Sequence, residues 1–261
     1  MSKTYHFISG LPRSGSTMLS AILKQNPRFH SSISDPFLNV VKGMIETTGF
    51  AYDVKHEVTD EMRKNMATAL FDGYYKHIEK PVCFNTNRGW TYQTPLLSNL
   101  FPKSKILVCV RDIGWVLDSF EVAHRKNPLG VDMFAGGPGG SVYQRCENYM
   151  NIYDGMVGAP YAGIKQAITS NEQNMLMIIE YNEFCKNPKG YMKAIYNFID
   201  EDYYEHDFNK VEGKWEMVDK EIGVELHTVK PKVEFKERKT IIPPDIWAQY
   251  DGWEVWRNLH D

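Results

Sequence analysis

The sequence predicts an α/β fold with three layers, in which helices cover both faces of a mainly parallel central sheet. Four short runs are apolar throughout rather than alternating, which is typical of strands buried on both faces. Helical patterns separate these runs. Alternating strands and helices favour right-handed β-α-β units. Such sheets bind ligands at the carboxyl ends of their strands, so we look for functional residues there.

The expected strands are YHFIS, PVCFNT, KILVCV and MLMIIEY, at residues 5–9, 81–86, 105–110 and 175–181. The expected helices lie at residues 17–25, 59–80, 115–126 and 188–199, with Thr59 as the N-cap of the second. The glycine-rich stretch 134–142 predicts a mobile loop. After about residue 203 the strand–helix repeat stops. We therefore expect a single domain over residues 1–261, with a C-terminal wrapping or lid-like segment.

Composition limits the function classes. A chain of 261 residues with a net charge of -3 suits one large domain and argues against nucleic acid as a partner. No apolar run approaches the roughly 20 residues of a membrane span, and the first residues contain no apolar signal core. The four cysteines show no C-x-x-C spacing, and Cys109 lies in an apolar run that predicts a buried thiol. These features lead us to expect a reduced, cytoplasmic protein.

A glycine loop directly follows the strand at 5–9. In GLPRSGST, residues 10–17, the glycines and the final threonine match the phosphate-binding pattern G-x-x-x-x-G-K-[ST], but Ser16 replaces the lysine. Loop amides and the positive end of the next helix converge on an anion in such a loop. This order predicts an anion site on a fold like that of the P-loop NTPases. Its candidate residues are Arg13, Ser14, Gly15, Ser16 and Thr17.

A second candidate anion site follows the strand at 105–110, in VRDIGWVLDSF. In a P-loop NTPase such a strand typically ends in an aspartate that helps to hold magnesium, whereas here Arg111 comes first. A guanidinium repels a metal and binds phosphate in a bidentate manner. Ser119 lies eight residues further on, on the expected helix, and adds a hydroxyl. The pair predicts a second phosphate site, although Asp112 leaves a magnesium role open.

Together, LPRSGSTML and VRDIGWVLDS resemble the two signatures of sulfotransferases that use 3′-phosphoadenosine-5′-phosphosulfate (PAPS). The resemblance covers segments from about residue 4 to residue 200. It implies that the glycine loop holds the 5′-phosphosulfate, and that Arg111 and Ser119 hold the 3′-phosphate. The loop is more similar to the tyrosylprotein and bacterial branches than to the cytosolic branch, which has the lysine. PAPS is the implied cofactor, with 3′,5′-adenosine bisphosphate as its product and no metal.

The resemblance implies further roles. In relatives, a lysine near this point of the sequence contacts the transferring sulfuryl group, and Arg88, in NTNRGWTYQTPLL, is the candidate for that role here. Arg13 is the cation of the glycine loop. Preorganised cations of this kind stabilise the charge that accumulates on the oxygens. Tyr181 resembles a tyrosine that contacts the nucleotide. Relatives cover the 3′-phosphate with a basic C-terminal loop, for which the candidates are Lys230, Lys232 and Arg238.

Transfer to a hydroxyl also needs a base within hydrogen-bond reach of the acceptor proton. In cytosolic relatives a histidine lies two residues after the catalytic lysine, but the position counted from Arg88 is Trp90. In the tyrosylprotein branch a glutamate follows the first helix, after a turn marked by proline. In the matching stretch, NPRFHSSISDPF, the nearest carboxylate is Asp35. We therefore expect Asp35 to be the catalytic base, with His30 as the second candidate.

These residues predict an enzyme that moves the sulfuryl group of PAPS to a hydroxyl, or less readily an amine, by in-line displacement without a metal. Two alternatives stay open. A P-loop kinase or nucleotide hydrolase would need the loop lysine and magnesium ligands, and a non-catalytic nucleotide-binding protein would show no turnover. The acceptor is expected to be a small molecule. Its pocket is expected to involve Trp90, Tyr92, the stretch 134–142 and a helix at 143–155, although such aromatic residues belong to the core just as often.

Overall fold

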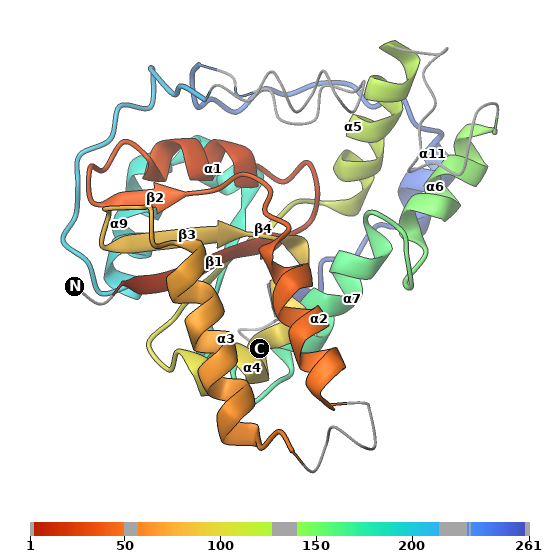
Figure 1. Ribbon diagram of the computed structural model, residues 1–261. Helices are drawn as coiled ribbons and strands as arrows, with labels where there is room; N and C mark the ends of the chain where they lie inside the picture. Colours follow the sequence, from red (N-terminus) through yellow and green to blue (C-terminus); the bar gives the residue numbers. More distant parts are fainter. Residues whose placement is uncertain (1–2, 50–56, 127–139, 214–228, 230, 259–261) are drawn as a thin grey trace.

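A computed structural model of the chain describes residues 3–49, 57–126, 140–213, 229 and 231–258. These residues form a five-stranded sheet in the order β2-β3-β1-β4-β5, and all the pairings are parallel (Figure 1). The strands are β1 (Thr4–Gly10), β2 (Phe29–Ser31), β3 (Val82–Thr86), β4 (Ile106–Val110) and β5 (Leu176–Glu180). The predicted α/β fold with a parallel sheet is confirmed.

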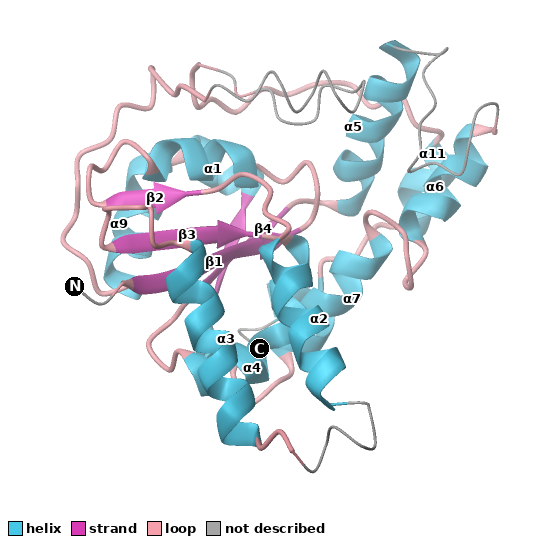
Figure 2. Cartoon of the chain, in the orientation of Figure 1, coloured by secondary structure: helices cyan, strands magenta, loops and turns pink. Residues whose placement is uncertain are grey.

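Helices cover both faces of this sheet (Figure 2). One face packs against α2 (Phe37–Gly49), α3 (Asp60–Tyr74), α4 (Thr94–Leu100), α5 (Ile113–Lys126), α6 (Val142–Met150) and α7 (Gly158–Ile168). The other packs against α1 (Ser16–Leu23), α8 (Tyr181–Lys186) and α9 (Pro188–Phe198). Successive residues of each strand alternate between the two cores, as the pleat requires. On β1, for example, Phe7 enters the first core and Ile8 the second.

The four strands expected from the sequence are present as β1, β3, β4 and β5, and the four expected helices are present as α1, α3, α5 and α9. Thr59 caps α3 as expected, because its side chain accepts a hydrogen bond from the Met62 amide. Cys109 is a buried thiol, also as expected. The sequence analysis missed β2, an edge strand of three residues that includes two polar side chains.

After α9 the chain runs past α1 toward α5, ending in α11 (Pro244–Gln249) and the short helix η3 (Val255–Asn258) (Figure 1). Two backbone hydrogen bonds, from Val211 to Pro231 and from Val233 to Phe208, tie this segment together. Val211 and Val233 are buried in the same core as α1. The single-domain arrangement with a wrapping segment stays a prediction. Most of the expected mobile loop, residues 134–139, lies outside the described residues.

No helix in the described part of the chain is long and apolar enough to cross a membrane.

Candidate functional site

The glycine loop joins β1 to α1 beside the carboxyl end of β4. Gly10, Arg13 and Gly15 adopt positive φ angles of 119°, 59° and 89°. Such angles suit glycine, and Arg13 therefore occupies a conformation that other residues seldom adopt. The Ser14 hydroxyl contacts the carbonyl oxygens of Leu11 and Cys109, the latter at 2.9 Å. Ser14 thus fastens the loop to β4 with its side chain, which leaves its main-chain amide for the predicted anion site.

The first turn of α1 has backbone amides that no side chain caps. Gly15 is the N-cap and provides no side-chain hydrogen bond to the first turn. Ser16 and Thr17 are partly exposed, and their hydroxyls make no hydrogen bond to another described residue. Uncapped first-turn amides and hydroxyls at the positive end of a helix favour a bound anion.

Arg13 links the loop to the second predicted site. Its Nε atom donates a hydrogen bond of 3.0 Å to the Ser119 hydroxyl on α5. The two residues are 106 positions apart in the sequence. They meet because β1 and β4 are neighbours in the sheet, with Phe7 opposite Ile106. The two predicted anion sites are therefore parts of one site.

Arg111 follows β4 directly and is partly buried. Its guanidinium lies 4.5 Å from the centre of the Tyr181 ring and 5.9 Å from that of Trp115. Its Nε atom is buried without a hydrogen-bond partner among the described residues. Burial is the main cause that lowers the pKa of Arg111. An unpaired cation held away from water is costly unless an anion binds it, so Arg111 is suited to a phosphate.

Tyr181 contacts both parts of the site. Besides stacking on Arg111, its ring packs so closely against Gly15 that a Cβ atom on Gly15 would lie 2.7 Å from it. Tyr181 begins α8, at the end of β5, and burial raises the pKa of its hydroxyl. The structure thus brings together four of the predicted segments at the carboxyl edge of the sheet, namely the glycine loop, Arg111, Ser119 and Tyr181.

Arg88 begins the short helix η1 (Arg88–Gln93) after β3. Its carbonyl oxygen accepts a hydrogen bond of 2.8 Å from Ser9 at the end of β1, which fixes the backbone beside the glycine loop. Its guanidinium contacts the Met156 sulfur at 3.7 Å, and no described carboxylate pairs with it. Burial, and secondarily the charge of Arg13, lower the pKa of Arg88 to about 10. Arg88 therefore stays charged at neutral pH.

Asp35 lies between β2 and α2 and is 6% exposed. Its Oδ1 atom accepts hydrogen bonds of 2.9 Å from the Phe37 amide and from the Tyr74 hydroxyl. Its carbonyl oxygen accepts one of 2.8 Å from the Asn87 side chain, next to Arg88. The carboxylate is thus held by the Phe37 amide and the Tyr74 hydroxyl, and no described contact joins it to the Arg88 guanidinium. His30 lies on β2 with its ring against Tyr75, and burial lowers its pKa.

Of the three basic C-terminal candidates, Arg238 is the one whose described contacts reach the site. Its guanidinium forms an ion pair with Asp118 and lies 4.9 Å from the centre of the Trp115 ring. Lys232 is exposed, and no described contact joins it to α5. Lys230 lies outside the described residues.

The expectation that Trp90 shapes an acceptor pocket is wrong. Its side chain is fully buried in the core, and its Nε1 atom donates to the Asn85 side chain at 2.8 Å. Tyr92 is partly buried and donates to the Ala159 carbonyl oxygen at the start of α7. The described helix nearest the expected 143–155 is α6, which ends at Met150.

Sequence reasoning missed two groups of residues around Arg111. Trp115 lies against the guanidiniums of both Arg111 and Arg238. Asp112 forms an ion pair of 2.7 Å with Arg257, which also pairs with Glu180 at 2.7 Å. Trp115 stands in the same short stretch as Arg111, but their association with Arg238 and the pairing of Arg257 with Asp112 and Glu180 join segments more than seventy positions apart and had no local sequence signal.

These elements define an α/β protein with a candidate anion-binding site at the carboxyl ends of β1, β3, β4 and β5. A family model described as "Sulfotransferase family" matches residues 6–205, which is most of the chain. The chain therefore belongs to the sulfotransferase family. No curated protein sequence matches it significantly.

Solved sulfotransferase structures share the fold. The sulfotransferase domain of the curacin biosynthetic pathway aligns with a TM-score of 0.55 at 14% identity, covering 97% of this chain and 92% of that one. The sulfotransferase of Alicyclobacillus acidocaldarius gives 0.52 at 14% identity, covering 85% and 92%. The sulfotransferase domain of the Synechococcus PCC 7002 olefin synthase gives 0.51 at 16% identity, covering 97% and 88%. At these identities the likeness concerns the fold alone.

Proposed function

We propose that this sulfotransferase takes its sulfuryl group from PAPS and transfers it to a hydroxyl group of a small acceptor. The observation that carries the proposal is the pair of guanidiniums of Arg88 and Arg111. Both are partly buried, and neither has a carboxylate partner among the described residues. Two such cations at one site favour a ligand with several negative charges.

The proposed donor fits the arrangement of the remaining residues. The amides of Ser14 and Gly15, the start of α1 and Arg13 receive the 5′-phosphosulfate. Arg111 and Ser119 receive the 3′-phosphate, and Tyr181 contacts the nucleotide between them. The hydrogen bond from Arg13 to Ser119 supports this assignment, because the two phosphate groups of one nucleotide need two anion sites side by side.

When bound, PAPS supplies the sulfuryl group, and its 5′-phosphate is the leaving group. As the acceptor oxygen bonds to sulfur, the bond between sulfur and the phosphate oxygen breaks, and the phosphate keeps the electron pair. Arg88 and Arg13 stabilise the charge on the oxygens around sulfur. Asp35 receives the acceptor proton on Oδ2, since its Oδ1 atom already accepts two hydrogen bonds.

The kinase or hydrolase alternative is less consistent with these contacts. Ser16 occupies the place of the lysine that reaches the β- and γ-phosphates. Asp112, the carboxylate left open as a magnesium ligand, is paired with Arg257 and also accepts a hydrogen bond from Asn182. A magnesium ion would have to compete with that guanidinium for the same oxygens.

The test is a thermal-shift comparison in which the full chain is heated with 3′,5′-adenosine bisphosphate in the absence of magnesium, or with Mg·ATP. We expect a rise of several degrees in Tm with the bisphosphate and none with Mg·ATP, because a ligand that binds only the folded state stabilises it by mass action. The reverse result would reject the proposal. Turnover of labelled PAPS against a panel of hydroxyl and amine acceptors then separates an enzyme from a nucleotide-binding protein without activity.

A further inference from the structure

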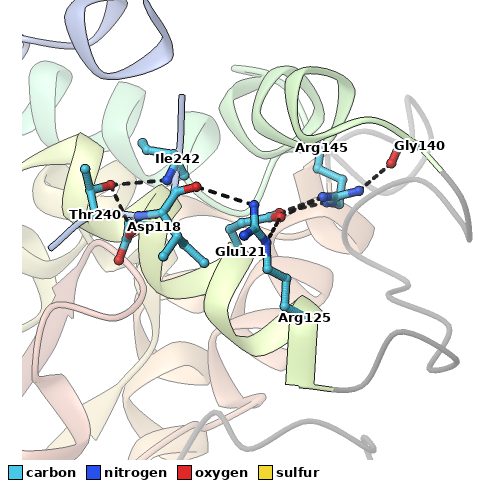
Figure 3. Close-up of polar contacts among 8 residues, drawn as sticks. Asp118, Glu121, Arg125, Gly140, Arg145, Thr240 and Ile242 are labelled. Carbon is cyan, nitrogen blue, oxygen red and sulfur yellow. Dashed lines mark hydrogen bonds and ion pairs between the residues drawn. The ribbon is translucent and has the colours of Figure 1, made fainter. Parts of the chain in front are cut away.

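Helix α5 carries two buried carboxylates, Asp118 and Glu121, on either side of Ser119 and Phe120 (Figure 3). Each one anchors a segment that is distant in the sequence. Asp118 binds the C-terminal segment at residues 238–241, and Glu121 binds Arg145 at the start of α6. Buried carboxylates are costly unless they are paired and hydrogen-bonded, so both contacts define how these segments dock.

Asp118 is fully buried and has three partners. Its Oδ1 atom accepts hydrogen bonds from the Thr240 hydroxyl at 2.9 Å and from the Ile241 amide at 2.7 Å. Its Oδ2 atom pairs with a guanidinium nitrogen of Arg238. The first two contacts hold the backbone of the C-terminal segment on α5, and the third sets the direction of the Arg238 side chain.

Asp118 holds Arg238 next to Arg111. Both guanidiniums lie against the ring of Trp115, at 4.9 Å for Arg238 and 5.9 Å for Arg111. The positive charge of Arg238 contributes to the lowered pKa of Arg111, after the effect of burial. Two neighbouring guanidiniums repel each other, and the carboxylate of Asp118 compensates for that repulsion. The side chain of Arg238 is 35% exposed, so part of the side chain is accessible to a ligand.

We infer that Asp118 is a positioning residue for the donor, which holds Arg238 so that it and Arg111 bind the same phosphate group. That group is the 3′-phosphate, so the inference rests on the proposed function. A phosphate dianion can accept hydrogen bonds from two guanidiniums at once, whereas a nucleotide without the 3′-phosphate gains nothing from their pairing. Asp118 therefore contributes to the preference for a 3′-phosphorylated nucleotide without touching it.

Glu121 provides a matched control. It is 3% exposed and lies one helical turn from Asp118. It pairs with Arg145 at 2.7 Å and with Arg125 at 2.8 Å, and no described contact joins it to Arg238 or Trp115. Glu121→Gln therefore removes a buried charge from the same helix and disturbs its packing to a similar extent. It leaves the guanidinium pair at the donor site in place.

The experiment measures the dissociation constants of 3′,5′-adenosine bisphosphate and of 5′-AMP by calorimetry, for the full-length wild type, Asp118→Asn and Glu121→Gln. We expect Asp118→Asn to reduce the preference for the bisphosphate by about tenfold, the effect of one charge-assisted hydrogen bond. Glu121→Gln should keep the wild-type preference. Arg238→Gln should reproduce the effect of Asp118→Asn, and the double variant should lose little more.

The inference is overturned if Asp118→Asn weakens both ligands by the same factor, because this is the effect of a merely structural residue. It is also overturned if the preference does not change. If Asp118→Asn does not fold, the ratio of the two dissociation constants is measured for Arg238→Gln instead. In that variant Asp118 keeps its hydrogen bonds to Thr240 and Ile241, so the C-terminal segment stays attached to α5. Failure of the wild type to bind either nucleotide rejects the proposed function itself, which distinguishes the two failures.

Discussion

Arg88 combines a rigid backbone with a guanidinium that no described carboxylate neutralises. The Ser9 hydroxyl donates to its carbonyl oxygen, and among the described residues its guanidinium contacts the Met156 sulfur. Its positive charge is therefore available for a negatively charged ligand or transition state. In the proposed reaction this charge acts where negative charge accumulates, at the oxygens around sulfur. The value of such a group lies in its being in place before the reaction begins.

We expect Arg88→Gln to lower kcat by about a hundredfold or more while the affinity for 3′,5′-adenosine bisphosphate changes little. The reason is that the lost charge acts in the transition state rather than on the bound nucleotide. Arg88→Lys is the matched variant: it keeps a cation and should retain much of the activity. Steady-state rates with PAPS and calorimetry with the product measure the two effects. A normal kcat for Arg88→Gln would remove Arg88 from the mechanism.

Individual site residues were predictable where their signal is local. Arg13 and Thr17 follow from the glycine loop, and Arg111 and Ser119 from their fixed spacing on one strand and helix. The contacts of Asp118 were not predictable, because its partners lie more than a hundred positions away. The roles of all these residues in binding and catalysis stay predictions.

The loop between β1 and α1 shows how one element depends on its glycines. Gly15 has a φ angle of 89°, and its Cα faces the ring of Tyr181. A side chain here would be strained and would also displace the tyrosine that stacks on Arg111. The loop and α8 are therefore packed together through a single residue without a side chain.

Gly15→Ala should lower the free energy of unfolding by about 1–3 kcal/mol, through the positive φ and the contact with Tyr181. It should also weaken binding of 3′,5′-adenosine bisphosphate. Gly43→Ala in the interior of α2 is the control. A Cβ there meets nothing within 4 Å, so the substitution should stabilise the protein by about 0.5–1 kcal/mol. Denaturant titrations measure the free energy of unfolding of both variants. Equal effects of the two substitutions would contradict the close packing of Gly15 against Tyr181.

Secondary-structure elements were predictable where the sequence has a continuous apolar run or a clear helical pattern, whereas the helices α2 and α7, of 13 and 11 residues, were missed. The strands β1, β3, β4 and β5 are continuous apolar runs, and α3 and α5 have clear helical patterns. The strand β2 was missed because only the pairing of Phe29, His30 and Ser31 with β3 makes it a strand. The helices α4 and α8 have seven and six residues, which is too short for a helical pattern to be recognised in the sequence.

At the scale of the whole molecule, two buried histidines couple folding to pH. His6 lies on the central strand and His206 in the segment after α9, and burial lowers the pKa of each to about 4. The unfolded chain takes up a proton on each histidine near pH 6.5, well before the folded protein does. Because the unfolded state then binds more protons, the free energy of unfolding falls as the pH drops from 6.5 toward 4.

We expect a loss on the order of 3 kcal/mol per histidine across that pH range. Urea titrations between pH 7 and pH 4 measure it. His206→Gln removes one titrating group and should flatten the dependence. A stability that stays constant between pH 6.5 and pH 4 would contradict the burial of both rings.

The central position of β1 has a consequence for how the chain folds. Thr4 must find Val82, and Phe7 must find Ile106, before the sheet exists. Contacts between such distant segments are slow to form because long loops must close first. The binding edge is complete only after β5 has paired with β4 and the segment around Arg238 has reached α5. Recovery of the proposed nucleotide affinity during refolding would therefore report when both of these contacts have formed.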